Sequence, residues 1–215
     1  MPTITPCLWF DGQAEEAASF YVSIFPSSRI LHVARYPENP RFEAGKVMVV
    51  KFELDGQEFI ALNGGPQFKF TEAISLTINC ETQAEIDHYW SRLTEGGGRE
   101  VQCGWLKDRY GLSWQVTPTI IGKLMSSGDG ARSARVMAAM MPMVKIDIAA
   151  LQKAYDGNRR AASSNRRREH RHVGNHRLER RRRAAGRARH RRLCLGLQAE
   201  QLHHLAVGDD RRAVR

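Results

Sequence analysis

The chain has 215 residues and carries 33 Lys and Arg against 23 Asp and Glu, a formal net charge of +10 at pH 7. Residues 158–215 hold 18 of the basic and 5 of the acidic residues, so the tail is +13 and the first 157 residues are −3. No apolar run approaches the ~20 residues that cross a bilayer, and no basic-then-apolar leader opens the chain. The four cysteines lack the close spacing of a zinc knuckle or a disulfide framework. We therefore expect a cytoplasmic protein with no membrane partner.

The composition changes near Gly157, where one predicted domain, residues 1–157, meets a tail, residues 158–215. The basic residues of the tail are all Arg, and the tail has no aromatic residue, Ile, Met, Pro or Lys. Such a segment cannot build a core, so we predict that it is disordered. Two interpretations stay open: a nucleic-acid-binding arm that releases counterions from phosphates, or a GC-rich coding region read in the wrong frame, that is, a frameshift product.

The first half of the domain predicts a strand, a helix and three further strands. Residues 3–10 form a short apolar run that suits a buried strand, and Asp11 is the expected cap of the following helix. Small and aromatic residues then recur at helical spacing until Pro26 ends the helix. Three β-rich runs follow, the last two joined by a hairpin at Asp55-Gly56: residues 29–36, 46–54 and 57–62.

The second half repeats this order. Gln13-Ala14-Glu15 recurs as Gln83-Ala84-Glu85, and Thr82 with Glu85 has the form of a capping box. The repeat predicts two βαβββ modules, about 1–66 and 67–118. The predicted elements of the second module are a strand at 73–80, a helix ended by glycines 96–98, and strands at 99–102, 105–108 and 113–117. Helices are then predicted at 119–125, at 133–141 and from an Asp147 cap to Gly157.

Several motifs, in this order, resemble the PhnB-like branch of the vicinal oxygen chelate superfamily, which also contains glyoxalases and bleomycin-resistance proteins. The resemblance covers about residues 3–157. The motifs are Phe10-Asp11-Gly12, Phe20-Tyr21, Ala61-Leu62-Asn63-Gly64-Gly65-Pro66, Cys103-Gly104-Trp105-Leu106-Lys107-Asp108-Arg109-Tyr110-Gly111 and Ser113-Trp114-Gln115-Val116-Thr117-Pro118.

The resemblance implies an α+β fold in which two βαβββ modules form a cupped mixed sheet around a pocket, with helices after it and commonly in a homodimer. It also implies a lyase, isomerase or dioxygenase of the vicinal oxygen chelate type, although the reaction is not specified. Proteins of this branch often bear the name 3-demethylubiquinone-9 3-methyltransferase. The glycines of this chain, at 64–65 and 96–98, do not form the strand-to-helix turn that commonly holds S-adenosylmethionine.

The superfamily's chemistry uses a divalent metal held by inward-facing His and Glu residues. Here only His32 and His88 lie in the domain, and Gln115 stands where a Glu ligand is common. The ligand supply therefore favours a domain without a metal. A magnesium- or manganese-type site that uses Thr5 and Gln115 remains open.

Six residues are candidates for lining the pocket, because they fall on inward strand positions or at its rim: Thr5, Cys7, Trp9, Asn63, Trp105 and Gln115. Each also has a structural interpretation. Cys7 suits a small packed residue better than a nucleophile, and the tryptophans suit core or dimer anchors. The charged run 107–109 suits a solvated turn. The predicted function is binding or transformation of a small molecule between the modules, and the alternative is nucleic-acid association through the tail.

Overall fold

The computed structural model describes residues 4–38 and 43–157. These residues divide into two compact units, one that runs to Pro118 and includes Met143–Ile146, and a second formed by Thr119–Pro142 and residues 147–157. The predicted Arg-rich tail, with both of its interpretations, lies outside the described residues. Within them, no helix combines the length and the apolar character needed to span a membrane.

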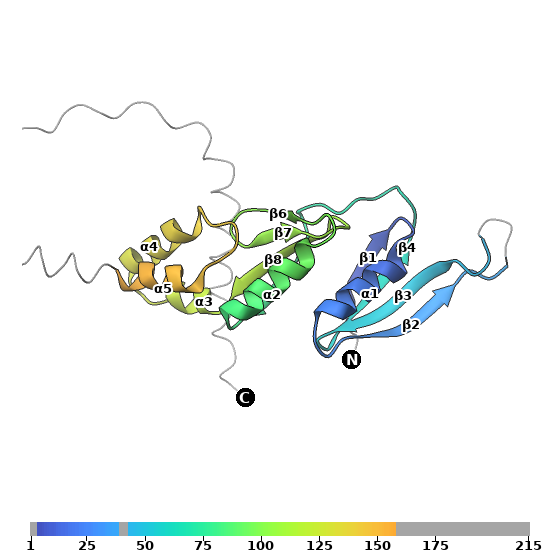
Figure 1. The fold of residues 1–215 in the computed structure, drawn as a ribbon, viewed down its shortest axis with the longest axis horizontal. Helices are drawn as coiled ribbons and strands as arrows, with labels where there is room; N and C mark the ends of the chain where they lie inside the picture. Colours follow the sequence, from blue (N-terminus) through green and yellow to red (C-terminus); the bar gives the residue numbers. More distant parts are fainter. Residues whose placement is uncertain (1–3, 39–42, 158–215) are drawn as a thin grey trace, which may run out of the picture. The chain divides into compact units, whose positions relative to one another are not determined.

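The first module has the predicted order of elements, with all four strands in one mixed sheet (Figure 1). The strand order is β1-β4-β3-β2, in which β1 pairs parallel with β4 and the other neighbours are antiparallel. The elements are β1 (Cys7–Phe10), α1 (Ala14–Ile24), β2 (Arg29–Arg35), β3 (Val47–Leu54) and β4 (Gln57–Asn63).

Helix α1 covers one face of this sheet because its small residues allow close approach. Ala14, Ala17 and Ala18 are fully buried, and the ring of Tyr21 stacks on Phe52 of β3 with centroids 6.2 Å apart. Strand residues that alternate with the buried ones, among them Cys7 and Trp9 on β1, point to the opposite face. The first sheet therefore has a helix-covered face and a helix-free face.

The second module repeats the arrangement, with strand order β5-β8-β7-β6 and β5 parallel to β8. Its elements are β5 (Ser75–Cys80), α2 (Gln83–Thr94), β6 (Arg99–Glu100), β7 (Trp105–Lys107) and β8 (Ser113–Pro118). The predicted capping box is confirmed: the Glu85 backbone N–H donates to Thr82 Oγ1 at 3.2 Å, and Glu85 Oε2 accepts from the Thr82 backbone N–H at 3.0 Å. The α+β fold of two βαβββ modules is thus confirmed.

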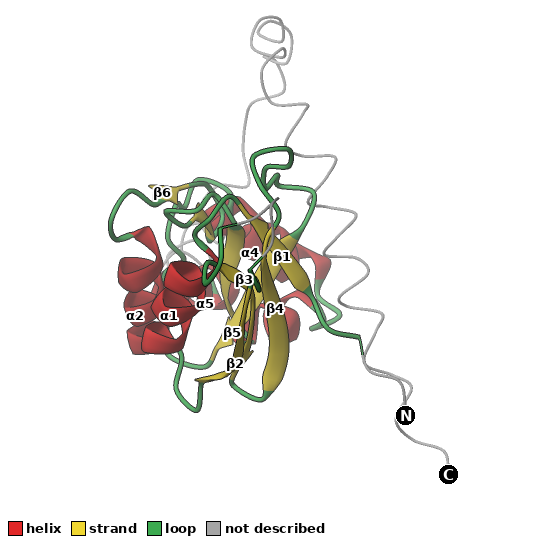
Figure 2. Ribbon diagram, turned by 90° about the vertical axis from the view of Figure 1, so that its right-hand side faces the viewer, coloured by secondary structure: helices red, strands yellow, loops and turns green. Residues whose placement is uncertain are grey.

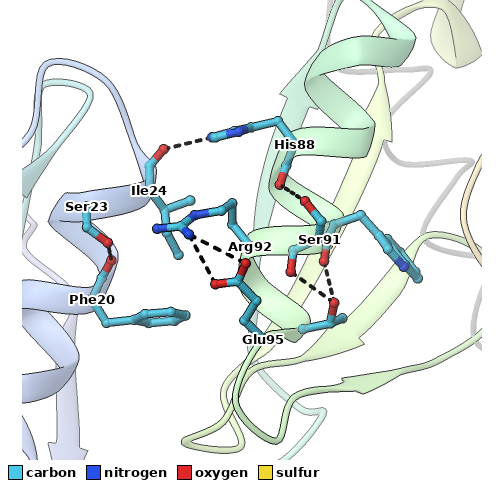
Figure 3. Close-up of polar contacts among 9 residues, drawn as sticks. Phe20, Ser23, Ile24, His88, Ser91, Arg92 and Glu95 are labelled. Atoms are coloured by element: carbon cyan, nitrogen blue, oxygen red, sulfur yellow. Dashed lines mark hydrogen bonds and ion pairs between the residues drawn. The ribbon is translucent and has the colours of Figure 1, made fainter.

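The helices of the two modules lie side by side (Figure 2). Figure 3 shows the contact: His88 Nε2 of α2 lies 3.1 Å from the carbonyl oxygen of Ile24 at the end of α1. Arg92 and Glu95, at the C-terminal end of α2, form an ion pair at 3.1 Å beside this contact. The helix-covered faces of both sheets consequently share one core, in which Trp114 of β8 lies 5.5 Å from Tyr21.

The predicted cap of α1 is wrong. Gln13 occupies the N-cap position without a side-chain hydrogen bond, and Asp11 lies two residues earlier. The Ala14 backbone N–H instead donates to Asn63 Oδ1 at 2.9 Å, and Asn63 Nδ2 donates to the Val47 carbonyl at 3.0 Å. A side chain at the end of β4 therefore satisfies the helix start that a local cap would otherwise serve.

The second unit contains three helices, α3 (Ile120–Met125), α4 (Gly130–Met140) and α5 (Ile148–Asp156). Asp129 caps α4, which therefore begins earlier than predicted, and Asp147 caps α5 as predicted. Arg135 of α4 donates to the Ala154 and Tyr155 carbonyls near the end of α5.

Candidate functional site

A cavity of about 170 Å³ lies between the two modules of the first unit. One wall comes from β1 and the start of α1, a second from the segment that connects the modules, and a third from the turn between β7 and β8. The lining residues are Trp9, Phe10, Asp11, Gln13, Phe68, Lys69, Phe70, Arg109 and Tyr110. Five of these nine residues are aromatic, so the walls offer flat apolar surfaces with a few polar groups between them.

The first wall is built around the indole of Trp9. Its Nε1 donates to the Gly65 carbonyl at 2.8 Å, and its ring meets Phe68 edge-on with centroids 4.9 Å apart. A Cβ at position 64 would overlap the six-membered ring of the indole, so only glycine lets the ring lie against this backbone. The Gly64-Gly65 pair after β4 therefore fixes one side of the cavity.

The third wall is organised by Asp108, a residue that is only 3% exposed. Its carboxylate accepts hydrogen bonds from Tyr21 Oη and Trp114 Nε1, each at 2.8 Å. The backbone N–H groups of Tyr110 and Leu112 donate to its other oxygen at 2.9 and 3.0 Å. Asp108 thus ties the β7–β8 turn to α1 of the other module and places the next two residues beside the cavity.

Burial governs the acid–base properties of this wall. Desolvation raises the pKa of Asp108 above its usual value, and the hydrogen bonds from Trp114 and Tyr21 oppose that shift. Desolvation also raises the pKa of Tyr110, as does its hydrogen bond to Glu16 at 2.8 Å. Tyr110 is therefore a neutral hydrogen-bond donor near neutral pH, and it joins the turn to α1 a second time.

Two cationic side chains, Lys69 and Arg109, line the cavity, and neither forms an ion pair with a described residue. Among residues 4–38 and 43–157, no carboxylate lies within 4.0 Å of the Lys69 ammonium or the Arg109 guanidinium. The guanidinium carbon of Arg109 lies 4.2 Å from the ring centroid of Phe20. A Cβ at position 96 would come within 2.6 Å of the same guanidinium, so Arg109 rests between an aromatic face and glycine backbone.

Of the six predicted pocket residues, only Trp9 lines the cavity. Asn63 points toward the helix-covered side and serves as the cap of α1. Cys7 is an exposed residue on β1, and partial desolvation of its thiol raises the pKa above the usual value, which disfavours a thiolate nucleophile. Thr5 is half-buried just before β1.

The structure brings Trp105 and Gln115 together elsewhere, as cross-strand neighbours on the helix-free face of the second sheet. Gln115 Nε2 donates to Ser75 Oγ at 2.9 Å. Ser113, two residues before Gln115 on β8, pairs with Ser75 and is 1% exposed. Its hydroxyl is the one buried side-chain oxygen or nitrogen without a hydrogen-bond partner in the described part of the chain. This face is polar, and it is separate from the aromatic cavity.

The donor sets do not fit the cofactors that the fold family and its name imply. Within residues 4–38 and 43–157, no three His, Cys, Asp or Glu side chains gather as metal ligands, and the Gln115 amide N–H is directed to Ser75. Neither strand order is that of a doubly wound sheet, and the turn from β1 to α1 contains Gly12 as its one glycine. We derive no chemical step through a metal or S-adenosylmethionine.

Sequence reasoning missed three residues of the site, Asp108, Arg109 and Tyr110. The run 107–109 is predicted as a solvated turn, and for Asp108 this prediction is wrong because its carboxylate is buried. A local signal exists, since an Asp that binds the backbone N–H two residues later forms an Asx turn. The bond to Tyr21, 87 positions earlier, has no local signal.

Comparisons with known proteins agree with this architecture. The family model of 3-demethylubiquinone-9 3-methyltransferase matches residues 2–117, which is 116 of 215 residues. A PhnB protein from Bacillus cereus, also described by that enzyme name, is 39% identical, with 55% of this chain and 100% of that chain covered and a TM-score of 0.51. A protein from Pseudomonas aeruginosa is 21% identical (55% and 98% covered, TM-score 0.47). The fosfomycin resistance protein FosX from Listeria monocytogenes is 12% identical (55% and 93% covered, TM-score 0.39). No curated protein matches.

Proposed function

Because the chain belongs to the 3-demethylubiquinone-9 3-methyltransferase family, the PhnB-like branch of the glyoxalase superfamily, we propose that it binds a small molecule in the cavity between its two modules. The observation that carries this proposal is the make-up of the cavity, whose walls come from both modules and from the segment between them. A concave site at such a junction, with aromatic walls and polar groups between them, is a common place for a small ligand.

The walls are held in place before any ligand arrives, which supports binding over incidental packing. Trp9 is fixed by its hydrogen bond to Gly65, and the β7–β8 turn is fixed by Asp108 and by the Tyr110–Glu16 bond. A preorganised site loses little conformational entropy when it is filled. The proposal concerns binding, and it assigns no reaction to the bound molecule.

A screen of single-ring compounds by ligand-observed NMR tests the proposal. Phe68→Ala removes an exposed wall of the cavity and should abolish binding of the hits, because the Phe68 ring shields one side of it. Val101→Ala is the matched control, since Val101 is an exposed apolar residue that does not line the cavity. Equal binding by the wild type and Phe68→Ala would place the ligand elsewhere and refute the proposal.

A further inference from the structure

We infer that the ligand of this cavity is a planar organic anion, with Lys69 and Arg109 as the residues that select its charge and the aromatic walls as the surfaces that hold its ring. The inference rests on the proposed function and adds the chemical class of the ligand. It follows from the size, the wall chemistry and the unbalanced charge of the cavity.

The size of the cavity limits the ligand to about one ring. Its 170 Å³ is well under the ~300 Å³ of a pocket for drug-sized molecules. The rings of Phe10 and Phe70 meet edge-on at 5.4 Å, as do those of Phe10 and Tyr110 at 5.8 Å. The walls are therefore flat surfaces against which a planar ring packs with large apolar contact.

The charge of the lining is positive, because Lys69 and Arg109 face one carboxylate, Asp11. Two cations less one anion leave a net charge of +1 on the walls. Asp11 makes no ion pair with either cation. Lys69 and Arg109 are exposed residues on these walls, and a cation without an ion-pair partner is free to attract an anion. A neutral ligand would leave this charge without a partner.

Arg109 is an exposed residue whose guanidinium is held by packing. Its guanidinium packs between the Phe20 ring and the backbone of Gly96, so little side-chain freedom is lost when it meets an anion. Its N–H groups make no hydrogen bond to any of the described residues, and the Gln13 side-chain amide in the same lining also lacks a partner among them. These groups are therefore available to the carboxylate or another planar oxyanion of a ligand.

Benzoate and benzamide provide the test, because they match in shape and differ in charge. Calorimetric titration of the full chain should give at least about tenfold tighter binding of benzoate, the difference that a charge-assisted hydrogen bond supplies. High salt, about 1 M, should reduce this preference by screening the cations. Lys69→Met and Arg109→Met should each lower benzoate affinity about tenfold, toward the benzamide level.

Arg29→Met is the matched control, since Arg29 is an exposed guanidinium on β2 outside the cavity, and it should bind both compounds as the wild type does. Equal affinities of the wild type for benzoate and benzamide would overturn the charge assignment and leave the binding function intact. No binding of either compound would overturn both. If Arg109→Met fails to fold, as judged by circular dichroism, Lys69→Met carries the test alone.

Discussion

Asp108 is the residue on which the connection between the two modules depends most. It has hydrogen bonds to α1, to β8 and to its own turn, and it adjoins two residues of the cavity wall. The resemblance to a known family predicts strand residues such as Gln115 as site residues. Asp108, in a turn, makes more hydrogen bonds than Gln115 does. Its partner Tyr21 lies 87 positions earlier in the chain, so no local sequence pattern indicates the contact.

Replacement of this carboxylate tests its structural role. Asp108→Ala should lower the free energy of unfolding by about 3 kcal/mol or more, because it leaves the buried Tyr21 hydroxyl and Trp114 indole N–H without an acceptor. Tyr21→Phe should cost only about 1 kcal/mol, since it removes a single hydroxyl. Urea denaturation measures the free energy of unfolding of both variants. Similar losses in the two would contradict the role of Asp108 as acceptor for several buried donors.

The thiols should differ in reactivity. Burial, with a smaller effect of the Glu85 charge, raises the pKa of Cys80 to about 11. At about pH 8 only roughly one thiol in a thousand is then the reactive thiolate. A thiol reagent followed by peptide mass mapping should label the exposed Cys7 well before Cys80 in the folded protein and both in urea. Equal rates in the folded protein would show that Cys80 is accessible and not desolvated.

At the scale of elements, the start of α2 was predictable from the sequence and the start of α1 was not. The capping box joins Thr82 to Glu85, so its signal lies within four residues. The cap of α1 comes from Asn63, which accepts from the Ala14 backbone N–H and lies 49 positions after it. A side chain so distant in the sequence gives no local pattern. The βαβββ order was readable for the same reason as the capping box, since alternation and helical spacing are local properties.

The charge of Glu85 should stabilise α2 in a pH-dependent way. Hydrogen bonds from the Thr82 and Glu81 backbone N–H groups lower the pKa of Glu85 below 4.5. A carboxyl whose pKa is lower in the folded than in the unfolded protein stabilises the fold when the pH is above its unfolded-state pKa. This contribution disappears as the pH falls through its folded-state pKa. Glu85→Gln keeps the cap geometry without the charge. Its stability deficit in urea should therefore shrink below pH 4.5, and a deficit that stayed constant would contradict the assignment to charge.

The turn after β4 should control the cavity. Gly64→Ala places a Cβ where the Trp9 ring lies, so the indole must move and the first wall is lost. We expect ligand binding to be abolished with a loss of stability of about 1–3 kcal/mol, the usual cost of overpacking. Gly122→Ala, on α3 where a Cβ meets open space, is the control and should leave binding unchanged. Retained binding in Gly64→Ala would show that the indole position is not required.

For the whole molecule, we propose that residues 1–157 suffice for folding and ligand binding and that the protein is a homodimer. The exposed side chains of Ile4 (93%) and Ile74 (73%), which occupy equivalent places in the two modules, support a second copy as their cover. Light scattering should give the mass of a dimer for both the full chain and residues 1–157. A monomeric mass for the full chain would contradict the dimer, and an unfolded truncation would contradict the domain boundary.

The most direct test of the central claim follows the indole N–H signals of the four tryptophans by NMR during a benzoate titration. The Trp9 indole N–H donates to Gly65 in the cavity wall, that of Trp90 donates to Glu100 away from it, and Trp105 lies on the helix-free face of the second sheet. The account predicts a saturable shift of the Trp9 signal with the Trp90 and Trp105 signals unchanged. A shift of Trp105 without Trp9, or no shift at all, would contradict ligand binding in the cavity between the modules.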